Sequence, residues 1–175
     1  ERDQLYARFK HTFTTDKLLT RRLVSFQANK QNRIYRWFRY KEGFSAELVQ
    51  YFIQKFQLEG KYVLDPFAGA GTTLFAAAEL GCKATGIEVL PVGVFFVEVR
   101  KAIQDLEYDT LRQAVQNIWP ELGRFQGANR MTPIPITQGA FPDETEQLLN
   151  AYLAYCDDIG GCVGKVLKFA AFSTL

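Results

Sequence analysis

Two acidic side chains bracket a glycine-rich stretch in the middle of this chain. Asp65 begins the run Asp65-Pro66-Phe67-Ala68-Gly69-Ala70-Gly71-Thr72-Thr73, and Glu88 follows 23 positions after Asp65. Closely spaced glycines let the backbone turn tightly and leave its amide groups open to a ligand. A neighbouring carboxylate suits a ligand that also carries a cation. The pattern therefore fits a zwitterionic amino acid joined to a nucleoside, with Asp65 facing the ammonium group and Thr72 and the loop amides facing a carboxylate or ribose.

Two other nucleotide-binding loops do not fit the spacing. The dinucleotide fingerprint Gly-x-Gly-x-x-Gly requires a third glycine where this chain has Leu74, and the phosphate-binding P-loop requires a lysine that the stretch lacks. An acid about 20 residues beyond a glycine loop typically accepts hydrogen bonds from ribose hydroxyls, and Glu88 lies 17 positions after Gly71. The alternatives are a plain strand–turn–helix for the loop and an ordinary surface acid for Glu88.

A strand, a turn, a helix and a second strand must position these groups. The apolar run 62–64 predicts a short, buried parallel strand. Thr72 and Thr73 are predicted to cap a helix over 74–80 that Gly81 ends. Residues 84–88 predict a second strand. Both acids would then lie at the carboxyl ends of parallel strands, where open α/β folds bind their ligands.

The loop together with Gly86-Ile87-Glu88 resembles the first two motifs of the S-adenosylmethionine-dependent amino-methyltransferases of DNA, which modify adenine N6 or cytosine N4. The resemblance implies an α/β, Rossmann-like, doubly wound sheet. It also implies that Asp65 and the backbone of 67–71 hold the methionine part of S-adenosyl-L-methionine, that Glu88 holds the ribose, and that Val89 flanks the adenine. The cofactor-binding residues expected in full are Tyr40, Phe44, Ser45, Asp65, Pro66, Phe67, Ala68, Gly69, Gly71, Thr72, Thr73, Glu88 and Val89.

The segment before the loop predicts a helix over about 46–57. Ser45 is a favourable N-cap and Glu47 suits the helix dipole in the first turn. In the family that the loop resembles, an element of this type closes the cofactor pocket, which implies that Phe44, Ser45 and, less directly, Tyr40 line it. The alternative is an ordinary capped core helix that Gly60 ends.

Charge is unevenly distributed although the chain carries a net +2. Eight basic residues and no acid fall between positions 17 and 41, and four aromatic residues are interleaved with the last of the charges. Basic and aromatic side chains together suit a phosphate backbone with unstacked bases. Arg33, Arg36 and Arg39 are therefore predicted to contact nucleic acid, DNA by resemblance and RNA as the alternative. The other interpretation is that the aromatic rings pack inward and the arginines form a solvated face.

Helical spacing recurs after the second strand. Pro91 is predicted to start a helix that runs to about residue 104. Asp109 or Thr110 is predicted to cap another helix, which ends at Trp119-Pro120. Residues 123–138 are predicted to be a loop, and 142–143 to open the last clear helix. Glycines at 160, 161 and 164 predict a turn or hinge. We expect two regions: a basic N-terminal segment with the pocket-closing helix over 1–60, and the cofactor-binding α/β region over 61–175.

Composition limits the other classes of protein. Hydrophobic residues make up 47% of 175 residues, enough for a sizeable core. No run of 18 apolar residues or signal peptide is present, so we expect a cytoplasmic protein with no membrane partner. The three cysteines are scattered and read as reduced thiols, and His11 is the only histidine, so neither a metal site nor a histidine-based triad is expected.

The motif that would hold the target amine does not occur. Amino-methyltransferases carry Asp/Asn/Ser-Pro-Pro-aromatic at the end of a later strand, and this chain has no Pro-Pro pair. No catalytic residue is therefore assigned. The chain, which begins at Glu1 and has few strand-like segments, is expected to be the cofactor-binding N-terminal part of a longer enzyme, inactive by itself.

Three alternatives remain. A tRNA guanine-N2 methyltransferase has a similar loop but usually a separate RNA-binding domain. A non-catalytic subunit of a split enzyme could bind cofactor or nucleic acid. A cytosine-C5 enzyme is disfavoured because no cysteine here follows a proline.

Overall fold

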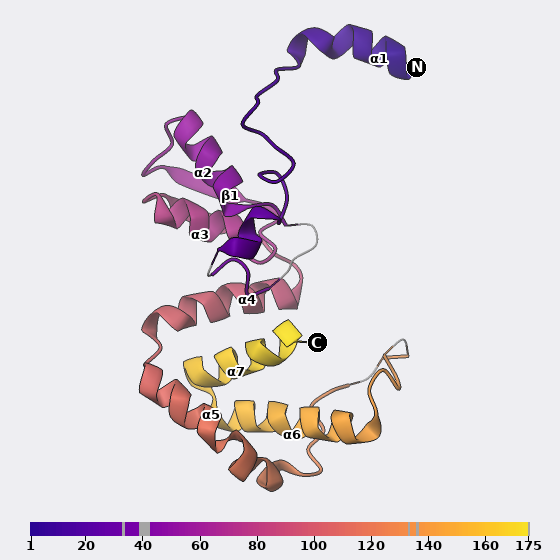
Figure 1. Cartoon of the computed structure of the whole chain (residues 1–175), viewed down its shortest axis with the longest axis vertical. Helices are drawn as coiled ribbons and strands as arrows, with labels where there is room; N and C mark the ends of the chain where they lie inside the picture. Colours follow the sequence, from indigo (N-terminus) through magenta and orange to yellow (C-terminus); the bar gives the residue numbers. More distant parts are fainter. Residues whose placement is uncertain (33, 39–42, 133, 136, 175) are drawn as a thin grey trace. The chain divides into compact units, whose positions relative to one another are not determined.

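A computed structural model of the chain describes residues 1–32, 34–38, 43–132, 134–135 and 137–174. The chain divides into two compact units, residues 1–87 and 88–175 (Figure 1). The division expected after residue 60, which rests on the motifs, stays a prediction. Among the described residues, no helix has both the length and the apolar composition needed to cross a membrane.

The first unit is built on a strand–helix–strand segment. Strand β1 (Tyr62–Asp65) pairs in parallel with β2 (Lys83–Gly86), and helix α3 (Thr72–Glu79) connects them. The parallel α/β arrangement predicted from the sequence is confirmed at this level. The predicted helix start is wrong by two residues: Gly71, with a φ of 78°, occupies the N-cap, so both threonines lie inside the helix.

One face of this sheet carries the core of the unit. Val63 and Ala84 are register partners and pack against buried residues of α3 and of α2 (Ala46–Lys55). The side chains that point the other way, Tyr62 and Leu64, are 78% and 63% exposed. The prediction of a fully buried strand is therefore wrong for these two residues, because within this unit the helices cover a single face.

The segment before α2 is irregular and is fixed to it by side chains. It contains α1 (Arg2–Phe9), the short helix η1 (Lys10–Thr12) and η2 (Ala28–Gln31). Asn29, 2% exposed, donates from Nδ2 to the Phe44 carbonyl (2.9 Å) and accepts from the Ala46 amide (3.0 Å). One buried amide group thus sets the start of α2. The predicted N-cap is confirmed, since the Ser45 hydroxyl accepts from the Leu48 amide at 3.1 Å.

The second unit is helical over its described residues. It contains α4 (Pro91–Ala102), η3 (Ile103–Asp105), α5 (Tyr108–Leu122), η4 (Gly123–Phe125), α6 (Asp143–Ile159) and α7 (Gly161–Thr174). Helix α7 packs against α4, α5 and α6 (Figure 1). Pro91 stands at the start of α4 as predicted.

Two expectations for this unit are wrong. Helix α5 begins at Tyr108 and runs through Pro120 to Leu122. Pro120 removes one backbone donor from the last turn of α5, and the helix continues for only two residues beyond it. The glycine turn is also shorter than predicted, since α7 begins at Gly161 and Gly164 lies inside it. A Cβ on Gly164 would overlap the Cys156 carbonyl oxygen, so this glycine serves the close approach of α6 and α7.

Candidate cofactor site

Asp65 lies at the carboxyl end of β1 and organises the start of the glycine loop. Its Oδ1 accepts a hydrogen bond from the Phe67 amide at 3.0 Å, and its carbonyl oxygen accepts from the Ile87 amide at 2.9 Å. The Ala68 amide in turn donates to the Ile87 carbonyl at 3.0 Å. The two bonds to Ile87 fix the loop to the chain that leaves β2, and the bond to Phe67 holds the turn within the loop. The Asp65 side chain remains half-buried, in reach of solvent and ligand.

The loop then turns into α3 through two left-handed glycines. Gly69 has a φ of 52° and Gly71 a φ of 78°, conformations that other residues rarely adopt. The Gly71 amide donates to the Ala68 carbonyl at 2.8 Å. The amides in the first turn of an α-helix have no acceptor within the helix, and together with the helix dipole they favour an anionic group. Asp65 and the start of α3 thus offer a negative and a positive partner within one short loop.

Gly86 belongs to the motif Gly86-Ile87-Glu88, but no role in the site was predicted for it from the sequence. A Cβ at Gly86 would lie 2.7 Å from Cβ of Ala68 and 3.0 Å from Cδ1 of Leu74. Such distances are far below van der Waals contact, so the loop packs directly on the backbone of β2. The available signal was a glycine at the end of a strand, a position that often marks a close backbone approach.

The predicted residues of the loop differ in exposure. Ala68 and Thr73 are buried, at 7% and 9% exposure, so they belong to the framework under the loop. Phe67 is 87% exposed and projects an apolar ring into solvent beside Asp65. Pro66 is exposed and Thr72 partly so. The surface that a ligand could contact therefore consists of a carboxylate, backbone amides, a hydroxyl and an exposed ring.

Glu88 and Val89 begin the second unit, and Ile87 separates them from the end of β2. Oε1 of Glu88 accepts a hydrogen bond from the Leu90 amide at 2.7 Å, which helps to start α4. Val89 is 86% exposed. Their predicted contacts with ribose and adenine stay predictions.

The residues expected to close the pocket have structural roles in the first unit. Ser45 is fully buried, and its hydroxyl donates to the Leu23 carbonyl while it caps α2. Phe44 is half-buried and packs against the core around α2 and α3. Tyr40 lies outside the described residues. Any contact of Phe44 or Ser45 with a ligand remains a prediction.

The basic side chains of this segment are exposed at every described position. Among the predicted nucleic-acid contacts, Arg36 is exposed, and Arg33 and Arg39 lie outside the described residues. Tyr35 is buried, and its hydroxyl donates to Oε1 of Glu79 at 2.9 Å. This ring packs inward, as the alternative interpretation expected of the aromatic residues. The adjacent Trp37 is 36% exposed.

Comparison with known proteins bears on the chain's family. A family model described as "DNA methylase" matches residues 8–92. The chain is 41% identical over 177 residues to the "Type II methyltransferase M.AvaI" of Nostoc sp. and to that of Anabaena variabilis, and the alignment covers 98% of this chain and 36% of each relative. It is 40% identical over 147 residues to the "Type II methyltransferase M.BsoBI" of Geobacillus stearothermophilus, covering 83% of this chain and 29% of that protein. The chain thus spans about a third of the length of these relatives. Among solved structures there is no match.

Proposed function

Over residues 8–92 this chain belongs to the DNA methylase family, the amino-methyltransferases of DNA, and we propose that it forms the part of such an enzyme that binds the methyl donor. Members of this family use S-adenosyl-L-methionine. One observation carries the proposal: the Asp65 carboxylate stands at the end of a parallel strand, beside a loop that ends in the amides of a helix N-terminus.

The residues present fit the chemistry of this cofactor. Asp65 would pair with the ammonium group of its methionine part, and the first-turn amides of α3 would receive the carboxylate. Glu88 would accept hydrogen bonds from the ribose hydroxyls. Phe67, which is strongly exposed, would cover an apolar part of the ligand, and the predicted contact of Val89 with the adenine rests on the resemblance alone. When bound, the cofactor supplies a methyl group on a positively charged sulfur.

The proposed reaction is transfer of that methyl group to an exocyclic amine of a DNA base, N6 of adenine or N4 of cytosine. Direct displacement depends on holding donor and acceptor in line, so its rate comes mostly from positioning. The residues of this chain hold the donor. The groups that hold the target amine are assigned to the longer protein, within a doubly wound sheet that β1 and β2 begin, because this chain carries no Pro-Pro motif.

A second candidate function rests on that same absence. Without the motif, the chain could serve as a cofactor-binding or nucleic-acid-binding subunit of a split enzyme. A tRNA guanine-N2 methyltransferase shares the loop type and is the RNA alternative.

Radiolabelled methyl transfer tests the proposal. The chain and the longer protein are each incubated with methyl-tritiated S-adenosyl-L-methionine and either mixed-sequence DNA or tRNA, and the modified nucleosides are identified by mass spectrometry. We expect label in DNA, as N6-methyladenine or N4-methylcytosine, from the longer protein and none from the chain alone. Asp65→Asn should lower transfer at least about tenfold, since a charged hydrogen bond is lost. Asp105→Asn, on the exposed helix η3, is the control.

Label in tRNA would favour the RNA alternative. Transfer by the isolated chain above a no-protein blank would contradict the assignment of the catalytic groups to the longer protein. Unchanged transfer in the Asp65→Asn protein would contradict the cofactor site.

A further inference from the structure

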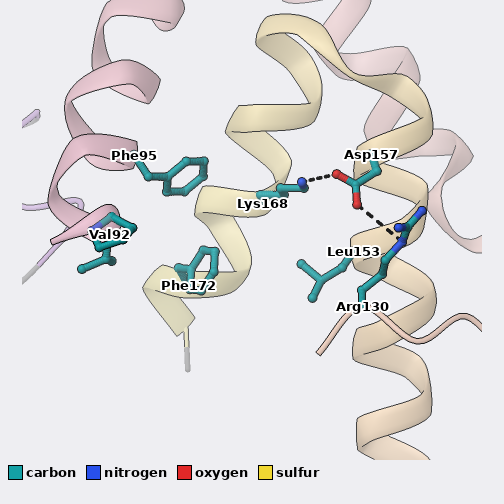
Figure 2. A pocket seen from close by; sticks show the side chains of 8 residues that line it. Val92, Phe95, Arg130, Leu153, Asp157, Lys168 and Phe172 are labelled. Atoms are coloured by element: carbon teal, nitrogen blue, oxygen red, sulfur yellow. Dashed lines mark hydrogen bonds and ion pairs between the residues drawn. The ribbon is translucent and has the colours of Figure 1, made fainter. Parts of the chain in front are cut away.

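A pocket of about 630 Å³ opens within the second unit, among α4, α6 and α7 (Figure 2). Its volume falls in the range of sites that hold small molecules, about 300–1,000 Å³. Most of its wall is apolar, and these residues line it: Pro91, Val92, Phe95, Leu153 and Phe172. They come from three helices that packing already holds together, so the wall is formed without a ligand.

The remaining wall is charged and carries more positive than negative groups. Asp157 on α6 pairs with the Lys168 ammonium on α7 and lies 3.6 Å from Nε of Arg130 (Figure 2). Two cations thus share one carboxylate, which leaves a net charge of +1 among the lining residues. A guanidinium has four N–H donors besides Nε, in a planar fork that matches a second carboxylate.

Arg130 is held at this place by its backbone. The Arg130 and Met131 amides both donate to Oδ1 of Asn150 on α6, at 2.6 and 2.8 Å. Asn150 is 7% exposed, and its Nδ2 donates to the Glu146 carbonyl at 2.9 Å. The buried side-chain amide of Asn150 therefore fixes the backbone at Arg130, from which the guanidinium extends. This positioning lowers the ordering cost that a mobile arginine would add to binding.

Helical spacing places apolar and charged groups beside each other. Leu153 and Asp157 lie four positions apart on α6, and Lys168 and Phe172 lie four apart on α7, so each helix contributes one apolar and one charged side chain to the same face. Asp157 and Lys168 are partly exposed, at 38% and 29% of their side chains, so the charged wall is accessible to a solute.

We propose that this pocket binds a small apolar carboxylic acid, whose ring or branched body lies against Phe95, Leu153 and Phe172 and whose carboxylate lies between Arg130 and Lys168. The charge of the ligand offsets the surplus positive charge, and its body removes exposed apolar surface from water. The site shares no residue with the Asp65 loop, and the proposal does not depend on the proposed methyl transfer.

The test uses 4-(trifluoromethyl)benzoate and its neutral counterpart 4-(trifluoromethyl)benzamide, titrated against the chain and followed by fluorine NMR. The two probes have nearly the same shape and differ in charge. We expect the benzoate to bind at least about tenfold more tightly than the benzamide, as for a charged hydrogen bond. Lys168→Gln and Arg130→Gln should each weaken benzoate binding about tenfold and leave benzamide binding unchanged. Circular dichroism checks that each variant is folded.

Lys165→Gln is the matched control, because Lys165 also lies on α7 but pairs with Glu98 at 2.7 Å and does not line the pocket. It should alter benzoate binding less than twofold. Equal binding of the two probes would overturn the proposal, as would the absence of benzoate binding at about 10 mM. Unchanged benzoate binding by the Arg130→Gln protein would also overturn the proposal. Because Arg130 lies outside the helices, this variant tests the proposal even if Lys168→Gln unfolds the protein.

Discussion

Gly86 shows at the scale of a single residue how the loop is held to the sheet. A Cβ there would meet Ala68 and Leu74, so Gly86→Ala must push the loop away from β2. We expect the free energy of unfolding to fall by about 1–3 kcal/mol, as for other overpacked sites, together with weaker cofactor binding. Urea unfolding and calorimetry measure the two effects.

Gly123→Ala provides the matched control for that substitution. Gly123 has a φ of −59°, and no described atom lies within 4 Å of where its Cβ would be. The free energy of unfolding of the Gly123→Ala protein should differ from that of the wild type by no more than about 0.5 kcal/mol, as for most surface substitutions. If the Gly86→Ala and Gly123→Ala proteins unfold alike, the loop does not depend on this close approach.

Local chemistry predicted some residues of the site correctly and missed others. Ser45 was recognisable as an N-cap because its type and its place before an apolar stripe are sufficient evidence. Thr72 and Thr73 looked like caps for the same reason, but Gly71 takes that position with a positive φ that the sequence does not encode uniquely. Asn29 was missed because its partners, Phe44 and Ala46, lie 15 and 17 positions away.

At the scale of elements, the substitution Gly164→Ala distinguishes the effect of helix propensity from the effect of packing. Alanine within a helix is normally more stable than glycine by about 1 kcal/mol, so propensity alone predicts that Gly164→Ala stabilises α7. The added Cβ would instead overlap the Cys156 carbonyl on α6. We expect a net loss of about 1–3 kcal/mol, measured by thermal or urea unfolding. A stabilised Gly164→Ala protein would mean that α6 and α7 do not approach as described.

The contact between the N-terminal segment and α2 should depend on pH. Hydrogen bonds from Lys55 and Tyr51 hold the pKa of the Asp16 carboxyl well below its usual value. A lowered folded-state pKa stabilises the fold above the unfolded value of about 4, and this contribution is lost as pH falls through the folded-state pKa. The protection of the amides around residue 16, which is the slowing of their exchange relative to that of an unfolded chain at the same pH, should therefore fall below about pH 4.

In the Asp16→Asn protein, this protection should already be low at pH 7 and should change little as the pH falls. Asp3→Asn, in the first turn of α1, should leave the protection and its pH dependence unchanged. An Asp16→Asn protein whose exchange near residue 16 matches the wild type at pH 7 would show that this contact does not hold the segment.

The errors at this scale have identifiable physical causes. Proline and clustered glycines are reliable helix breakers in isolation, yet α5 continues through Pro120 and α7 includes Gly164. At Gly164 the close packing of α6 and α7 outweighs local preference, whereas Pro120 is exposed and lies two residues from the end of α5. The run 62–64 indicated a strand correctly, but apolar composition could not reveal that Tyr62 and Leu64 lack a cover within their own unit.

For the whole molecule, the basic segment predicts a salt-dependent affinity for DNA. Each phosphate contact that is lost lowers the slope of log affinity against log salt by about 1. Replacing Arg33, Arg36 and Arg39 with glutamine should therefore flatten the slope by about 2–3, measured by fluorescence anisotropy with a DNA duplex. The control triple substitution neutralises exposed cations of the second unit, Lys101, Arg112 and Arg124. Equal slopes for wild type and the arginine variant would mean that these arginines are structural.

The most direct measurement is a calorimetric titration of the chain with S-adenosyl-L-methionine. We expect saturable heat from the wild type and at least about tenfold weaker binding by Asp65→Ala, because the ammonium group loses its charged partner. Glu59→Ala, an exposed acid just before β1, should bind like the wild type. A wild-type chain that gives no heat at millimolar cofactor, or an Asp65→Ala protein that binds as tightly as the wild type, would contradict the assignment of the methyl-donor site to this loop.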